Sequence, residues 1–194
     1  MGDLLIARHG ETEWSRAGRH TGRTDLPLTS GGEAQAKSLA PLLAGRTFGL
    51  VLTSPLVRAR RTAELAGLTG AVPEPDLFEW DYGAYEGITT AEIHRTRPDW
   101  YLWTDGVPPG REFPGESPEQ VGERADRVLS RVAGALEEGD VVLVAHGHLL
   151  RVLTARRLGL PPSAGRLFRL ETGTLSRLSL EHGRPVVAEW NTRP

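Results

Sequence analysis

The sequence predicts an α/β protein, a three-layer α/β/α sandwich with a mostly parallel central sheet. Three short apolar runs, at residues 4–7, 50–52 and 141–145, have the unbroken hydrophobicity of strands that are covered on both faces. A turn and a segment of helical character follow each run. This alternation of strands and helices is typical of a sheet with helices packed on both of its faces.

Two helices are predicted around the second apolar run. Thr29 can cap a helix that ends near Gly45, and Pro41 is expected to kink this helix or to limit its length. Ser54 and the proline after it predict an N-cap and a first helical position, for a helix that runs to about Gly67. The helix N-termini after Thr29 and Ser54 could supply oriented backbone N–H groups to an anion.

The last third of the chain predicts a long helix and a pair of strands. Ser117 and Gln120 have the spacing of a capping box, apolar residues recur behind them at helical spacing, and Gly139 suits the C-terminal stop. The stretches 175–180 and 186–190 are separated by a His-Gly turn. They predict an antiparallel pair of strands at the edge of the sheet.

The stretch 89–116 differs from the rest because it is rich in tryptophan, proline and glycine. We expect a short helix and a long loop there, with Trp100 and Trp103 packing in the core or in a lid. Loops of this length in compact domains usually carry function or move. We therefore expect a single domain over residues 1–194, with a lid-like segment at about 89–116 that sets substrate specificity.

The composition excludes several classes of partner. The 23 lysines and arginines and 25 aspartates and glutamates give a formal net charge of -2, so no global positive field can hold a nucleic acid or an anionic membrane. The chain has no cysteine, which excludes disulfides and thiolate chemistry. We expect a cytoplasmic protein without a nucleic-acid or membrane partner, and both a monomer and a homodimer remain open.

Histidines and arginines gather where the predicted strands end. Arg8 and His9 end the first strand, Arg58 lies in the helix after the second strand, and His146 follows the third. The carboxyl ends of parallel strands form the ligand crevice of an open α/β sheet, so these side chains are expected to meet. Arginine matches phosphate oxygens with two N–H groups at once, and a neutral imidazole can attack phosphorus. The pattern predicts a site for a phosphoryl group.

A leaving alkoxide needs a proton, which arginine cannot supply. Glu79 is our candidate donor because it lies between two apolar aromatic residues, and partial burial there would keep a proton available. Asp81 and Glu86 are alternatives for this role. A metal site at His146 and His148 is disfavoured because no third ligand lies nearby in the sequence and cysteine is absent. We therefore expect no metal and no other cofactor.

Five motifs in this order resemble the histidine phosphatase or phosphoglycerate mutase-like superfamily. They are "RHGETEWS", "TGRTDLPLT", "SPLVRARRTA", "EWDYGAYEG" and "AHGHLLR". The resemblance implies a metal-independent phosphoryl transfer in two steps. His9 would become a phosphohistidine, Arg8, Arg58 and His146 would hold the phosphoryl oxygens, and Glu79 would protonate the leaving group and then help to activate water.

The resemblance also implies further substrate-binding positions. Thr21 and the backbone of Gly147 match positions that line the phosphate pocket of the family, and many members carry asparagine where this chain has Ser15. Within the superfamily the motifs look most like the branch of sedoheptulose-1,7-bisphosphatase and related acid phosphatases, in which an arginine at the position of Arg151 reaches a substrate phosphate. The full predicted set is Ser15, Thr21, Gly22, Gly147, His148 and Arg151.

The expected function is therefore hydrolysis of small phosphorylated metabolites, with sugar phosphates or bisphosphates first. One alternative is a phosphoglycerate mutase, but mutases of the family usually have an arginine directly after the motif glutamate, where this chain has Trp80. Another is a catalytically silent homologue that binds a phosphometabolite. Such a protein would have lost one of the five core residues, and this chain retains them all.

Overall fold

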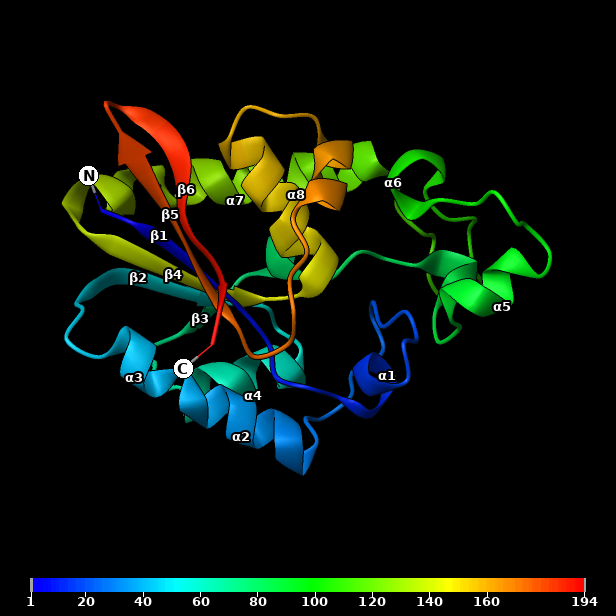
Figure 1. Cartoon of the computed structure of the whole chain (residues 1–194), viewed down its shortest axis with the longest axis horizontal. Coiled ribbons are helices and arrows are strands. Elements are labelled where there is room, and N and C mark those ends of the chain that lie inside the picture. The colour runs from blue at the N-terminus through cyan, green and yellow to red at the C-terminus, as the bar shows by residue number, and fades with distance from the viewer. Residues whose placement is uncertain (1, 194) are drawn as a thin grey trace.

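The computed structural model describes residues 2–193 and contains one six-stranded sheet in the order β3-β2-β4-β1-β5-β6 (Figure 1). The strands are β1 Leu4–Arg8, β2 Phe48–Thr53, β3 Val72–Pro73, β4 Asp140–Ala145, β5 Leu175–Glu181 and β6 Arg184–Thr192. Strand β4 pairs in parallel with β1 and with β2, and β2 pairs in parallel with β3. Strand β5 is antiparallel to β1, and β6 is antiparallel to β5. The predicted mostly parallel sheet and its antiparallel edge pair are confirmed.

Helices cover both faces of this sheet. The α-helices of residues 2–193 are α1 Glu13–Arg16, α2 Ser30–Ser38, α3 Ala40–Leu43, α4 Val57–Leu65, α5 Thr90–His94, α6 Leu102–Asp105, α7 Pro118–Glu138 and α8 Gly147–Arg157. Figure 1 shows α7 and α8 on one face and α2, α3 and α4 on the other, and a separate apolar core lies on each side. The three-layer α/β/α prediction is confirmed. Within residues 2–193, no helix combines the length and the apolar character of a membrane span.

Two of the predicted helix starts are confirmed. The Thr29 hydroxyl accepts the backbone N–H of Gly32 at 2.9 Å, and the helix breaks into α2 and α3 just ahead of Pro41. Ser117 and Gln120 form a reciprocal capping box at the start of α7. At the start of each of these two helices, a nearby side chain accepts a free backbone N–H group. The sequence pattern was therefore sufficient to find both starts.

The predicted N-cap at Ser54 is wrong. Helix α4 begins at Val57, its capping position is Leu56, and the backbone N–H of Val57 donates to Oδ1 of Asp25 at 2.8 Å. The hydroxyl of Ser54 instead lies 2.7 Å from Nε2 of His146. A distant carboxylate and a histidine thus compete successfully with the local capping arrangement.

The segment 89–116 contains two short helices, α5 and α6, where one was expected. They form a lobe beside the sheet layers, at the right of Figure 1. Trp100 and Trp103 are buried beneath this lobe, and the indole N–H of Trp100 donates to the carbonyl of Gly106 at 2.9 Å. Their predicted packing role is confirmed.

The parallel register brings three strand ends together. Arg8 in β1 lies opposite Ala145 in β4, and the backbone N–H of His9 donates to the carbonyl of Ala145 at 3.0 Å. The N–H of Ser54, directly after β2, donates to the carbonyl of Val144 at 2.9 Å. The residues that follow β1, β2 and β4 are therefore held by backbone hydrogen bonds at one edge of the sheet.

Candidate active site

His9 presents one free ring nitrogen at this edge. Its Nδ1 lies 2.7 Å from the carbonyl oxygen of Gly10, and a carbonyl can only accept, so Nδ1 carries the proton and Nε2 carries a lone pair. In residues 2–193, the buried side-chain polar atoms without a partner are Nε of Arg8 and Nε of Arg157. The unbonded Nε2 of His9 is therefore open to the pocket that His9 lines.

The surroundings keep this imidazole neutral. Burial lowers the pKa of His9 well below its usual 6.5, and the positive charges of Arg58 and Arg8 lower it further. The same causes, burial first, lower the pKa of His146. A neutral imidazole with a fixed tautomer is the form that can act as a nucleophile.

Arg8 contributes its guanidinium group to the same pocket. Its Nη1 donates to the carbonyl of Leu170 at 2.5 Å, while its buried Nε has no partner. The guanidinium lies against Gly147, where an added Cβ would come within 3.1 Å of Cζ of Arg8. A buried N–H without an acceptor costs about 1–3 kcal/mol. Arg8 and His9 line the same pocket, so the positive guanidinium and the lone pair of His9 together favour an anionic ligand.

Arg58 and His146 lie behind His9 and do not line the pocket. The rings of His9 and His146 are 5.1 Å apart, and Nε of Arg58 donates to Nδ1 of His146 at 3.2 Å. The other guanidinium nitrogens of Arg58 donate to the carbonyls of Thr21, Gly22 and Thr24 at 2.9–3.2 Å. The prediction that both side chains contact phosphoryl oxygens therefore stays a prediction.

Glu86 also holds the loop of residues 21–24, whose carbonyls bind Arg58. Its carboxylate accepts the backbone N–H groups of Gly22, at 3.0 Å, and Thr24, at 3.1 Å. A Cβ at Gly22 would come within 2.5 Å of the carbonyl oxygen of Trp80, so this position requires glycine. Thr21 lines the pocket, whereas Gly22 shapes the loop behind it.

Glu79 reaches the pocket from the loop before the lobe. Its Oε1 accepts the backbone N–H groups of Trp80 at 2.8 Å and Leu149 at 2.9 Å, and its Oε2 accepts that of His148 at 3.0 Å. Each carboxylate oxygen has two lone-pair positions, so one position on Oε2 remains for a proton. Glu79 lines the pocket, which the alternatives Asp81 and Glu86 do not.

The remaining predicted residues line the same pocket. Ser15 belongs to the capping box of α1 with Thr12. Nδ1 of His148 lies 2.5 Å from the hydroxyl oxygen of the buried Tyr82. Arg151 lies over the ring of Trp103, 4.5 Å from its centroid. The structure therefore brings Arg8, His9, Ser15, Thr21, Glu79, Gly147, His148 and Arg151 together.

Sequence reasoning missed six further lining residues, which are Gly18, Arg19, His20, Tyr82, Thr90 and Leu170. Nδ1 of His20 lies 2.8 Å from the carbonyl of Ile88, so Nδ1 donates and Nε2 is left as an acceptor. The bridge that joins residues 19 and 89 brings this segment to the pocket. No local pattern marks such a contact, although the position of His20 directly before "TGRTDLPLT" was a usable signal.

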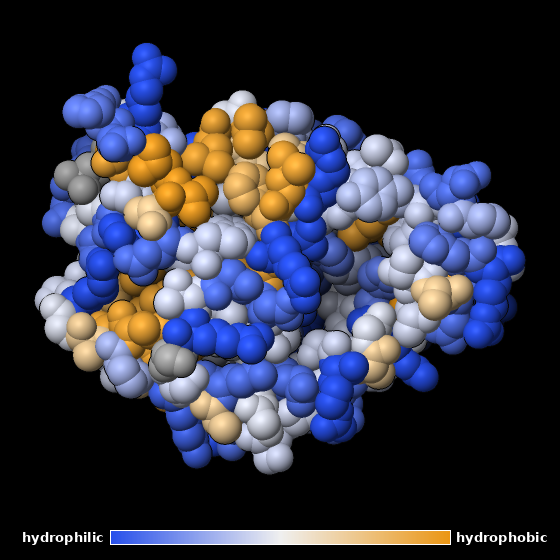
Figure 2. Space-filling model, viewed as in Figure 1, coloured by the Kyte–Doolittle hydropathy of each residue, from blue (hydrophilic) through white to orange (hydrophobic). Residues whose placement is uncertain are grey.

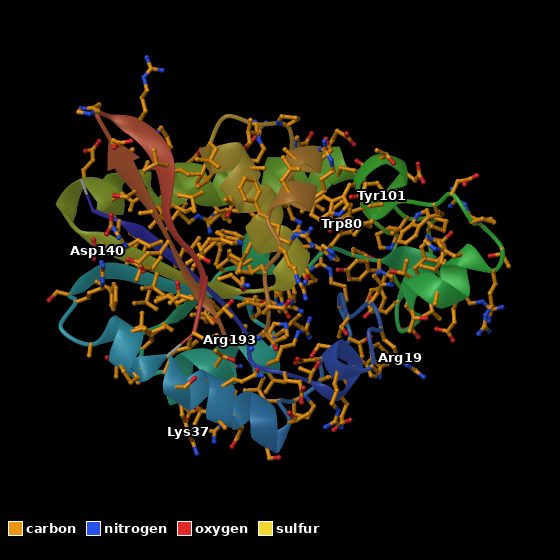
Figure 3. The ribbon with its side chains drawn as sticks, in the orientation of Figure 1. Arg19, Lys37, Trp80, Tyr101, Asp140 and Arg193 are labelled. Carbon is orange, nitrogen blue, oxygen red and sulfur yellow. The ribbon has the colours of Figure 1, made fainter. Side chains whose placement is uncertain are left out.

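The pocket has a volume of about 250 Å³ and lies between the sheet edge and the lobe, where Figure 2 shows a hollow with hydrophilic borders. Three arginines line it, Arg8, Arg19 and Arg151, against one carboxylate, that of Glu79. Arg19 lies beside α1, on the lobe side of the molecule (Figure 3). The excess of positive charge favours a small anion.

The donor set does not suggest a metal site. Among residues 2–193, no group of three or more His, Cys, Asp or Glu side chains is arranged to hold a metal ion. The neighbours of His9 and His146 are instead the guanidinium groups of Arg8 and Arg58, which would repel a cation.

Stability should fall as the pH drops below 6.5. Burial lowers the pKa of His9, His146 and His148 well below that value in the folded chain. The unfolded chain binds protons below pH 6.5 that the folded chain does not, so each histidine removes about 1 kcal/mol per pH unit. Above pH 7 the free energy of unfolding should change little through these groups.

Urea unfolding measured between pH 5 and pH 8 tests this expectation. A free energy of unfolding that does not fall as the pH drops below 6.5 would contradict it. The exposed His182, in the turn between β5 and β6, provides the control, because His182→Gln should leave the slope as it is.

Comparison with known proteins shows the family. Residues 4–193 match the model of the histidine phosphatase superfamily, branch 1. An acid phosphatase of Mycobacterium tuberculosis is 42% identical over 187 residues, which cover 93% of this chain and 87% of the relative. A sedoheptulose 1,7-bisphosphatase of Saccharomyces cerevisiae is 35% identical, and the match covers 80% of this chain and 67% of the relative.

A protein of Photorhabdus laumondii named as a probable phosphoglycerate mutase is 34% identical, over 98% of this chain and 90% of the relative. A solved structure from M. tuberculosis has a TM-score of 0.92 at 39% identity and covers 99% of this chain and 98% of its own. The predicted family and fold are confirmed. The chain belongs to the histidine phosphatase superfamily, branch 1, and its relatives include enzymes named as phosphatases.

Proposed function

We propose that this chain hydrolyses small phosphomonoesters, sugar phosphates and bisphosphates foremost, through a phosphohistidine at His9. The observation that carries the proposal is a single pocket lined both by His9, with the lone pair on its Nε2, and by the guanidinium of Arg8. A nucleophile beside an anion-binding donor is the minimum that phosphoryl transfer needs.

In the first step, Nε2 of His9 attacks phosphorus while the bond from phosphorus to the ester oxygen breaks. Arg8 balances the negative charge on the phosphoryl oxygens as this charge shifts during transfer. The proton on Oε2 of Glu79 passes to the departing oxygen, and the product alcohol leaves. Arg58 and His146 act from behind His9, either as further phosphoryl ligands or by holding its surroundings in place.

In the second step, water attacks the phosphoryl group on His9. The Glu79 carboxylate, now without its proton, accepts one proton from this water, and the bond from phosphorus to Nε2 breaks. Inorganic phosphate leaves, and both His9 and Glu79 return to their starting forms. The same two side chains therefore serve both steps, and no metal takes part in either.

The organic part of the substrate would face the wall formed by His20 and His148. Nε2 of His20 is an acceptor because its Nδ1 donates to Ile88. The buried hydroxyl of Tyr82 needs an acceptor, so in this proposal it donates to Nδ1 of His148. Nε2 of His148 then carries the ring proton and is a donor. A sugar hydroxyl both donates and accepts, so this wall suits a polyhydroxylated leaving group.

Arg151 would hold a second phosphate or the far end of the substrate. Its guanidinium is fixed by the carbonyls of Gly165 at 3.0 Å and Arg166 at 3.2 Å, and it lines the pocket. The lobe at 89–116 contributes Thr90 to the same pocket and is our candidate for the specificity segment. The relatives named as acid phosphatase and sedoheptulose 1,7-bisphosphatase support this substrate class.

Mutase activity is disfavoured although a relative carries that name. The residue after Glu79 is Trp80, whose side chain is fully buried and whose indole N–H donates to the carbonyl of Glu116 at 2.9 Å. This position therefore offers no cation that would retain a phosphoglycerate for transfer in the reverse direction.

A substrate panel in excess chelator tests the proposal. We expect phosphate release from sugar phosphates and bisphosphates at least about tenfold faster, as kcat/KM, than from phosphates without neighbouring hydroxyls. Phosphoglycerates should be hydrolysed rather than isomerised. Loss of activity on chelation, or rapid exchange between the two phosphoglycerates, would contradict the proposal.

A further inference from the structure

A buried ion pair lies outside the pocket, between α7 and the end of the lobe segment. Nε of Arg124 lies 2.6 Å from Oε1 of Glu116, and its Nη2 donates to Oε2 at 2.8 Å. The two side chains are only 9% and 13% exposed. Neither lines the pocket, and the chemistry described above does not use either of them.

Arg124 is also bonded to the chain just before the proposed proton donor. Its Nη1 donates to the carbonyls of Asp76 and Phe78, both at 2.8 Å. Its Nη2 also donates to the carbonyl of Glu79 itself at 3.3 Å. One guanidinium thus binds three backbone oxygens over a stretch of four residues.

Glu116 holds the chain just after the donor. Its Oε2 accepts the backbone N–H of Asp81 at 2.8 Å, and its own N–H donates to the carbonyl of Asp81 at 3.0 Å. Its carbonyl accepts the indole N–H of Trp80 at 2.9 Å. Trp80, labelled in Figure 3, lies close to α8 and α6. The pair therefore binds the backbone on both sides of Glu79.

This arrangement matters because Glu79 lies on neither a helix nor a strand. Residues 78–82 run between two single turns of 3-10 helix, at 75–77 and 83–85. No ladder of backbone hydrogen bonds fixes them, whereas α7, which carries Arg124, is a helix of 21 residues. Through these hydrogen bonds the Arg124–Glu116 pair fixes the loop 78–82 to the long helix α7.

Stability alone is a weak reason for such a pair. Taking two charges out of water costs several kcal/mol each, and apolar replacements of a buried pair are often neutral or stabilising. A proton donor, in contrast, must be held to within about 0.5 Å of its productive position. The contacts on both sides of Glu79 match the second requirement.

We propose that Arg124 and Glu116 are positioning residues that hold the proton donor Glu79 in its productive position. This inference rests on the proposed function, because it takes Glu79 as the donor. Donation matters most when the leaving group is a poor one, such as an alkoxide, and least when it is a nitrophenolate, which departs without a proton. Misplacing Glu79 should therefore slow the two kinds of substrate unequally.

The experiment compares kcat/KM for glycerol phosphate and for para-nitrophenyl phosphate in Arg124→Met and Glu116→Gln. We expect each variant to lose at least about tenfold on glycerol phosphate and less than about threefold on the aryl ester. Arg124→Lys keeps the charge but not the forked geometry, so it should remain impaired on the alkyl ester. Glu116→Gln is the milder change if Arg124→Met does not fold.

Arg127→Met is the matched control. Arg127 lies one turn further along α7 and pairs with the side chain of Asp76, but its own side chain is 54% exposed and no bond joins it to the backbone of Glu79. This variant should leave both rates unchanged. If it also shows the unequal loss, the effect comes from α7 in general and the inference fails.

Two further outcomes would overturn the inference. Equal losses on both esters would show that the pair only supports the fold or the binding of phosphate, and no loss on either ester would show that Glu79 does not need it. Glu79→Gln distinguishes a failure of this inference from a failure of the proposed function. If that variant shows the unequal loss and the pair variants do not, the inference fails while the proposed function stands; if Glu79→Gln shows none, the proposed donor itself fails.

Discussion

His9→Ala should reduce phosphatase activity by at least about 10³-fold, because it removes the atom that forms the bond to phosphorus. The fixed tautomer of His9 leaves a lone pair on Nε2 beside Arg8 in the sequence, whereas the free Nε2 of His20 belongs to the wall that would face the organic part of the substrate. The remaining anion site at Arg8 should still bind substrate. We therefore expect a large fall in kcat with a much smaller change in binding.

Trapping the intermediate checks this expectation directly. The unmodified chain, mixed with substrate and quenched in alkali, should carry one phosphoryl group on the peptide that contains His9, and His9→Ala should carry none. The exposed His182 again offers a control, since His182→Ala should keep full activity. Retention of activity in His9→Ala, or a phosphoryl group on a different peptide, would disprove the role of His9.

Glu79→Gln should lower kcat/KM for alkyl phosphates by about 10²–10⁴-fold, the usual contribution of a positioned general acid. The amide cannot give up a proton to an alkoxide, and its NH₂ group would face backbone N–H donors that now meet a carboxylate. Aryl phosphates with good leaving groups should be affected far less. Equal losses on the two substrate types would contradict the assignment of Glu79.

The pH dependence of this variant adds a second readout. Because the pKa of His9 lies well below 6.5, a moderately acidic medium does not remove the nucleophile. The loss of activity in Glu79→Gln should therefore persist in such a medium, because protonation of His9 does not limit the rate there. Glu119→Gln, an exposed carboxylate near the start of α7, should behave like the unmodified chain.

Much of the fold could be predicted because its signals are local. The apolar runs that became β1, β2 and β4 are continuous, and the hydroxyls of Thr29 and Ser117 accept backbone N–H groups only three residues away. The same logic failed at Ser54, where a better partner, His146, lies 92 residues along the chain. Local propensity identified the elements, and tertiary contacts decided which polar side chains were free to cap them.

The candidate site shows the same division. Arg8, His9 and Glu79 could be identified because strand ends and aromatic neighbours are visible in the sequence. Arg124 could not, because its role depends on carbonyls 45–48 residues away. His20 escaped for a similar reason, since Ile88, which fixes its tautomer, is 68 residues distant.

The start of α8 links catalysis to folding. His146, at the capping position of this helix, provides no side-chain acceptor, and the first free N–H groups of the helix go to the carboxylate of Glu79. The proposed proton donor is thus also the N-terminal cap of α8, a contribution typically worth about 1 kcal/mol. A substitution that removes the Glu79 carboxylate also uncaps a core helix, so we expect activity and stability to fall together at this one position.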